Sequence, residues 1–148
     1  MEHTELEQIR VEKINRMQEA GIDPYPTRSN VTHTTRQALD LFAQVESDGQ
    51  ERSGEITLAG RLRAIRLMGK ANFAHIEDGF GKIQLFFRIN ELGEESIQQL
   101  KDLYDLGDFI EASGTLFRTR TGEITLQVSR FQMLAKSITP LPASKDEV

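Results

Sequence analysis

The side chains best suited to chemistry in this sequence lie along one short stretch, residues 82–88 (Lys-Ile-Gln-Leu-Phe-Phe-Arg). Its alternating pattern predicts a β-strand, in which neighbouring side chains point to opposite faces. One face is apolar and belongs in a core: Ile83, Leu85 and Phe87. The other face carries an amide, an aromatic ring and a guanidinium, which suit hydrogen bonding to and stacking on an unpaired base: Gln84, Phe86 and Arg88.

Two further strands are expected to add side chains to this solvent-facing surface. Side chains at alternate positions of a strand share a face, and this parity places Phe73 and His75 outward on the preceding strand and Glu123 outward on a later one. A flipped-out pyrimidine can stack on Phe73 while Gln84, a donor and acceptor, and Glu123, an acceptor, engage its Watson–Crick edge. Uracil, with one N–H between two carbonyls, matches that pair better than cytosine. The predicted reading surface comprises Phe73, His75, Gln84, Phe86 and Glu123.

Each of these residues also has an ordinary structural explanation. Phe73 would be a core residue if a one-residue bulge turned it inward. His75 fits a surface or structural histidine, because no nucleophile or second histidine accompanies it on these strands. Gln84 and Glu123 would serve equally as polar cross-strand neighbours. Three nearby arginines would hold an RNA backbone, a positioning role without sequence information: Arg61, Arg63 and Arg66.

Composition limits the classes of function. The chain has 148 residues, no cysteine and a net charge of −5, so nucleic-acid binding must be local rather than a bulk electrostatic effect. Cysteine absence fits a reducing cytoplasm, and no apolar run approaches the ~20 residues of a membrane span. Three scattered histidines lack metal-ligand spacing, so no metal site is expected: His3, His33 and His75.

The first third of the chain is predicted to contain two helices. Residues 4–20 predict a helix with a capping box from Thr4 and Glu7, and prolines in residues 23–26 predict a stiff connector. A second helix is predicted over residues 34–45, capped by Thr34 and Gln37, before a polar loop at 47–54.

From residue 55 onward the pattern changes to that of β-strands. Strands are predicted from residue 55, over 70–78, 82–89, 109–118 and 123–135, with a helix over 94–104. The fold class is therefore mainly β with flanking helices. The order β-β-β-α-β-β is that of a five-stranded Greek-key OB-fold barrel, preceded here by an N-terminal helical arm. The expected divisions are an arm and connector at 1–54, the barrel at 55–136 and a linker at 137–148.

At the level of motifs the sequence resembles the anticodon-binding region of bacterial-type class II lysyl-tRNA synthetases over nearly its whole length. Related aspartyl and asparaginyl enzymes share the barrel and its Phe, Gln and Glu, but the Pro-Tyr-Pro arm and the exit sequence are similar to the lysyl enzymes. The resemblance rests on these segments: Gly-Ile-Asp-Pro-Tyr-Pro (21–26), Gly-Arg (60–61), Arg-Leu-Met-Gly-Lys-Ala-Asn-Phe (66–73), Ile-Gln (83–84), Leu-Gly-Asp (106–108), Gly-Thr-Leu-Phe-Arg-Thr-Arg-Thr-Gly-Glu (114–123) and Leu-Ala-Lys-Ser-Ile-Thr-Pro-Leu-Pro (134–142).

The resemblance implies specific roles and partners. Phe73 would stack on the central uridine of a lysine anticodon, Gln84 and Glu123 would read it, and Arg66 would contact the loop backbone. It extends RNA contact to Arg61, His75 and Phe86. It also implies a catalytic domain that this chain lacks, so the chain alone should not aminoacylate and should hold no cofactor. The full-length enzyme would be a cytoplasmic homodimer that uses ATP, Mg²⁺, lysine and tRNA(Lys).

Two other functions remain open from the residues. A free-standing OB module that binds single strands without sequence preference predicts several stacking aromatics along a broad basic groove, and parity supplies only Phe73 and Phe86. A protein-interaction barrel would use the same two rings to anchor a partner chain.

Overall fold

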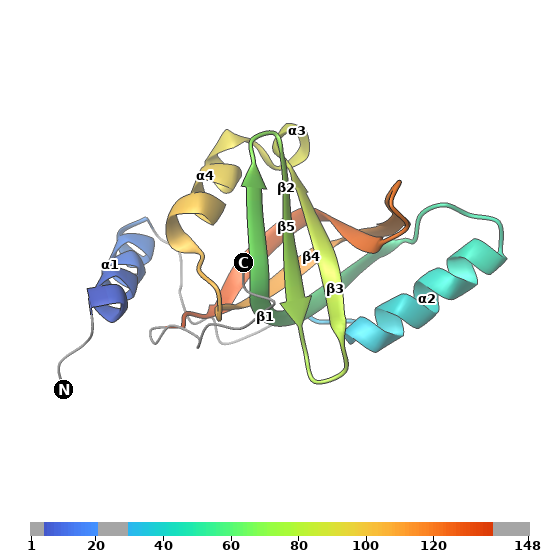
Figure 1. The fold of residues 1–148 in the computed structure, drawn as a ribbon, viewed down its shortest axis with the longest axis horizontal. Helices are drawn as coiled ribbons and strands as arrows, with labels where there is room; N and C mark the ends of the chain where they lie inside the picture. Colours follow the sequence, from blue (N-terminus) through green and yellow to red (C-terminus); the bar gives the residue numbers. More distant parts are fainter. Residues whose placement is uncertain (1–4, 21–29, 138–148) are drawn as a thin grey trace.

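A computed structural model describes residues 5–20 and 30–137. Five strands form a barrel in the centre of the molecule, with helices at its sides and ends (Figure 1). The elements in chain order are α1 (Glu5–Glu19), α2 (Thr35–Ser47), β1 (Glu55–Met68), β2 (Ala71–Glu77), β3 (Lys82–Arg88), α3 (Ile89–Leu92), α4 (Glu94–Leu103), β4 (Phe109–Arg118) and β5 (Ile124–Ala135).

The sheet is a closed barrel with the strand order β1-β2-β3-β5-β4. All neighbouring strands are antiparallel except β3 and β5, which pair in parallel from Gln84↔Thr125 to Phe86↔Gln127 and close the barrel. The long β1 serves two neighbours, because its first half pairs with β4 and its second half with β2. This arrangement confirms the expected five-stranded barrel with a helix between the third and fourth strands.

At most positions, strand parity sorts the side chains into core and surface as the sequence predicts, and Gln84 is a buried exception. The apolar face of β3 is buried, as are Ala74 and Ile76 on β2 and Leu126 on β5. On β4, Gly114 approaches the carbonyl of Gln127 so closely that no larger residue fits there. The core is therefore enclosed by tight strand contacts as well as by apolar side chains.

Helix α2 packs on the barrel and is joined to it at its first turn. The predicted capping box is present, because the Thr34 hydroxyl accepts from the Gln37 N–H and the Gln37 side chain accepts from the Thr34 N–H. Thr35 donates both its N–H and its hydroxyl to Asp78 in the β2–β3 turn, at 2.8 and 2.7 Å. Phe42 buries its ring against the barrel.

Helix α1 lies beside α4 at the other end of the molecule (Figure 1). It is joined to the barrel by a buried ionic cluster in which Lys13 contacts Asp105, which also contacts Lys136. Lys136, with no exposed side chain, also donates to Asp108 at 2.6 Å and to the Leu103 carbonyl at 2.8 Å. Burial raises the pKa of Asp108, whereas for Asp105 the effect of burial is outweighed by hydrogen bonds from the two lysines, which lower its pKa.

The differences from expectation are local. The structure adds the short helix α3, which follows β3 directly, and the other predicted boundaries after residue 70 agree to within one residue. Three predicted features lie outside the described residues: the Thr4 cap, the connector at 23–26 and the tail beyond Ser137. The division into an arm at 1–54, a barrel and a linker stays a prediction.

Replacing Asp78 by Asn should destabilise the fold most near neutral pH. Asp78 accepts four hydrogen bonds, two from Thr35 and two from the N–H groups of Phe80 and Gly81. Burial would raise its pKa, but these donors prevail and lower it. A carboxylate with a lowered folded pKa contributes stability above its unfolded pKa of about 3.9, and the contribution is lost as pH falls through the folded value.

We therefore expect Asp78→Asn to lower the free energy of unfolding by about 1–3 kcal/mol at pH 7, and by less at pH 3. Urea denaturation at both values measures this, with exposed Asp40→Asn on α2 as the control. A difference that is the same at both pH values would contradict the assignment.

Replacing Lys136 by Met should cost about 3–5 kcal/mol, because Asp108 would remain buried without its cation. The double variant Lys136→Met, Asp108→Asn should recover part of that loss. Urea denaturation of both variants tests the pair, and a loss below about 1 kcal/mol in the single variant would show that the cluster is not an ionic clamp.

Candidate nucleic-acid interface

Phe73 and Phe86 form the aromatic part of the predicted reading surface. They are opposite each other on β2 and β3, half-buried, with stacked rings whose centroids are 5.0 Å apart. The β2–β3 register runs without a bulge, so Phe73 is not turned into the core. Phe86 has a ring on both sides, since Phe117 of β4 lies 6.1 Å away. Phe86 therefore supports Phe73 from behind.

Gln84 is placed differently from the prediction. Parity predicted a solvent-facing amide, but Gln84 is only 4% exposed. The parallel pairing with β5 covers it, and its Nε2 donates to the hydroxyl of Thr125 at 3.0 Å. Its Oε1 accepts from Arg66 at 3.2 Å. An amide has two donors and two acceptor positions, so one of each remains after these contacts.

Glu123 and His75 meet at the edge of the same surface. Glu123 is exposed just before β5, and its Oε1 lies 3.1 Å from Nε2 of His75. The Glu123 N–H donates to the Thr119 hydroxyl, which fixes the residue at the end of the β4–β5 turn. The structure thus brings both predicted residues together.

Two of the three predicted backbone-binding arginines lie in different places, and the third, Arg63, pairs with Glu77 of β2 at 3.7 Å. Arg66 joins the surface, because its guanidinium lies 5.8 Å from the ring centroid of Phe73 in addition to its contact with Gln84. Arg61 does not, because it donates to the Gly107 carbonyl before β4. Arg61 is therefore not assembled with the other predicted site residues.

Two adjoining cavities open on this surface. One, of about 380 Å³, is lined by Arg66, Phe73, Gln84 and Glu123 together with the β4–β5 turn. The other, of about 590 Å³, shares Gln84 and Glu123 and extends past His75 toward α2. Both volumes suit small ligands the size of a nucleotide. The turn residues were not predicted as site residues: Thr119, Arg120 and Thr121.

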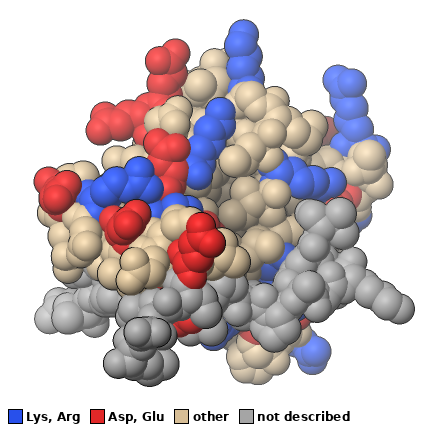
Figure 2. Space-filling view, turned by 60° about the vertical axis from the view of Figure 1, so that its left-hand side comes forward, with Lys and Arg blue, Asp and Glu red and all other residues tan. Residues whose placement is uncertain are grey.

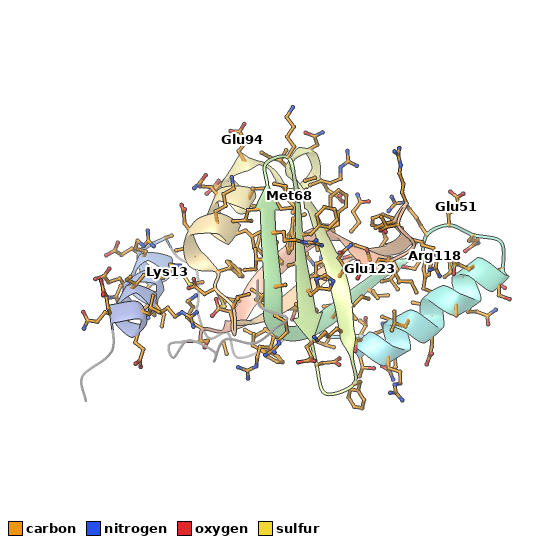
Figure 3. The ribbon with its side chains drawn as sticks, in the orientation of Figure 1. Lys13, Glu51, Met68, Glu94, Arg118 and Glu123 are labelled. Atoms are coloured by element: carbon orange, nitrogen blue, oxygen red, sulfur yellow. The ribbon has the colours of Figure 1, made fainter. Side chains whose placement is uncertain are left out.

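Arg118 links α2 to that turn and was also missed. It donates two hydrogen bonds to the carboxylate of Glu46 on α2, at 2.7 and 2.9 Å, and one to the Gly122 carbonyl at 2.7 Å. Arg118 and Glu123 lie near each other, between the barrel and α2 (Figure 3). The Arg118–Glu46 pair therefore positions the turn from which Glu123 projects. Its residues are far apart in sequence, so local patterns give no signal of it.

Comparison with known families identifies the architecture. A family model of the OB-fold nucleic acid binding domain matches residues 56–139, more than half of the chain. The chain belongs to this family. The match covers all five strands of the OB fold, and with them the Phe73 and Gln84 surface.

The OB-fold chain is also similar to curated proteins named lysine–tRNA ligase. It is 47% identical over 133 residues to one from Dehalococcoides mccartyi, covering 90% of this chain and 26% of the relative. It is 46% identical over 143 residues to one from Roseiflexus castenholzii, covering 96% and 28%. For one from Clostridium novyi the values are 42% over 142 residues, 95% and 26%. The chain spans about a quarter of the length of these relatives.

The charge distribution around the OB fold is mixed. On the face that Figure 2 presents, Lys and Arg side chains are interspersed with Asp and Glu side chains. The cations at the cavities therefore act locally, from Arg66 and Arg120 at the smaller one and Arg63, Lys82 and Arg118 at the larger.

Within the described residues, no helix has the length and apolarity needed to cross a membrane.

The contact between α2 and the turn can be tested by titration. The hydrogen bonds from Arg118 lower the pKa of Glu46 below its ordinary value. In Arg118→Gln, the Glu46 pKa should return to the ordinary range, and the amide signals of Gly122 and Glu123 should shift. Carboxyl and amide NMR measures both effects. Unchanged amide signals in the variant would show that the pair does not position the turn.

Proposed function

We propose that this chain reads the central uridine of a lysine anticodon, as the anticodon-binding part of a longer lysine–tRNA ligase. One observation carries the proposal. The Gln84 amide is held from both sides, by Arg66 and Thr125, at the wall of a base-sized cavity that also includes Phe73 and Glu123. A fixed amide beside an aromatic ring is suited to selecting one unpaired base.

In this mechanism the uridine enters the smaller cavity and stacks on Phe73, which Phe86 supports. The remaining Nε2 hydrogen of Gln84 donates to a uracil carbonyl, and an acceptor from Gln84 or Glu123 takes the uracil N–H. Cytosine would present an unprotonated ring nitrogen to the same acceptor, which leaves both groups unsatisfied. Arg66 and Arg120 contact the neighbouring phosphates, while His75 orients the Glu123 carboxylate.

The activity of the longer protein is part of the same proposal. The named relatives are lysine–tRNA ligases, and the chain corresponds to about a quarter of them. We assign lysine activation and transfer to tRNA(Lys), with ATP and Mg²⁺, to a catalytic domain joined through residues 137–148. In residues 5–20 and 30–137 no three His, Asp or Glu side chains group in a way that could hold a metal ion. A cytoplasmic homodimer is the proposed full-length form.

A single-strand-binding module without sequence preference is the second candidate. The observation in its favour is Phe117, which adds a third ring to the two that parity predicted. Such a module would bind any unpaired strand through stacking and phosphate contacts.

Binding to two RNA hairpins separates the two candidates. One is a lysine anticodon stem-loop and the other differs only by cytidine at the central position. The chain should bind the uridine loop about 5- to 150-fold more tightly at fixed salt, because one good base contact contributes roughly 1–3 kcal/mol. Phe73→Ala should weaken binding to both loops, and Gln84→Ala should abolish the preference.

Exposed Phe80→Ala in the β2–β3 turn and Gln98→Ala on α4 are matched controls that should bind normally. Equal binding of both loops by the unaltered chain would overturn the uridine-reading function in favour of the second candidate. Binding to neither loop, or binding without salt dependence, would favour a protein-interaction barrel.

A further inference from the structure

The aromatic surface extends beyond the proposed uridine site. Phe117 continues the line of rings from Phe73 and Phe86, so the line crosses from β2 over β3 to β4. This line of rings passes over β5, where Phe117 is paired with Thr125. The Thr125 side chain is small and fully buried, so it leaves room for the rings of Phe86 and Phe117 to lie close together. The outer end of this line, at Phe117, has no role in the uridine contact described above.

Arg52 adds a second flat group at this end. It comes from the loop between α2 and β1, and its guanidinium lies 4.8 Å from the centroid of the Phe117 ring. A hydrogen bond of 3.4 Å to the Thr115 hydroxyl helps to hold it there. Guanidinium planes and aromatic rings both stack on bases, so Arg52 and Phe117 together form one stacking surface.

The cavity beside this surface favours a base over a phosphate. Its volume is about 400 Å³, similar to that of the proposed uridine cavity, and its wall includes Phe117, Arg52, Gln50 and Glu51. Glu46 and Arg118 also line it but are paired with each other. The negative charge of Glu51 balances the positive charge of Arg52, so the site lacks the excess positive charge that a phosphate requires. A neutral base, in contrast, can stack on Arg52 and Phe117.

We propose that Phe117 and Arg52 form a second base-binding position, which takes the unpaired base next to the one on Phe73, whatever its identity. The proposal deepens the proposed function and rests on it, because it assumes that a base occupies the Phe73 cavity. The ring-to-ring steps of 5.0 and 6.1 Å bring the two positions within reach of neighbouring nucleotides in an unstacked loop. Stacking without contacts to a base edge explains why identity is not read.

Abasic RNA loops test the second position directly. The full 148-residue chain is titrated with the lysine anticodon stem-loop and with two copies that carry an abasic nucleotide immediately 5′ or immediately 3′ of the central uridine. Phe117→Leu and Arg52→Gln should each weaken binding of the intact loop by roughly tenfold. Arg36→Gln, an exposed arginine on α2, is the matched control.

The expected result is a coupling between one abasic position and the two variants. One abasic loop should bind the unaltered chain about tenfold more weakly, and neither variant should weaken that loop further. Equal weakening of all three loops by Phe117→Leu would mean a structural role and overturn the proposal, as would normal binding of the intact loop by both variants.

The outcome is separable from that of the proposed function. Loss of uridine preference in the unaltered chain, with the abasic coupling intact, would remove the uridine-reading function and keep a second stacking position. A retained uridine preference without the abasic coupling would keep the uridine-reading function and remove the second stacking position. Absence of binding to every loop would overturn both proposals.

Discussion

The short parallel pairing of β3 with β5 is the contact on which the rest of the molecule depends. It involves only the register from Gln84↔Thr125 to Phe86↔Gln127, yet it closes the barrel. The same pairing places Gln84 against Thr125 and brings Phe86 near Phe117. Barrel closure and assembly of the binding surface are therefore one event, and a change in this register would separate Gln84 and Phe86 on β3 from Thr125 and Phe117 on β5 and β4.

A buried amide is an unusual choice at the wall of a binding site. Removing Gln84 from water costs free energy unless its polar atoms find partners, and the barrel supplies Arg66 and Thr125 for half of them. The other half is available to a ligand that offers the complementary groups. Because the amide is already fixed, little side-chain freedom is lost on binding, and a mismatched base leaves a buried polar group unpaired.

Local pattern predicted most of the fold and part of the site. Alternation and turn residues located the strands, and parity found Phe73, His75 and Glu123 on one face, because these signals depend on neighbours in sequence. Parity does not report how deeply a strand is covered, which is why Gln84 was expected in solvent. Phe117, Arg118 and Lys136 were missed because their environments arise from contacts between distant segments. Sequence patterns lead one to expect an exposed lysine at position 136, whereas the structure buries it between two aspartates.

Helix α2 is attached at both ends, through Thr35 to the β2–β3 turn and through Glu46 to Arg118 at the end of β4. The second attachment joins residues 72 positions apart. During synthesis from the N-terminus, α2 can therefore form its own hydrogen bonds early but cannot reach its final position until β4 has emerged and paired. Non-local strand pairing is slow compared with helix formation. Although α2 precedes the barrel in the chain, it should thus be among the last elements to dock on the barrel.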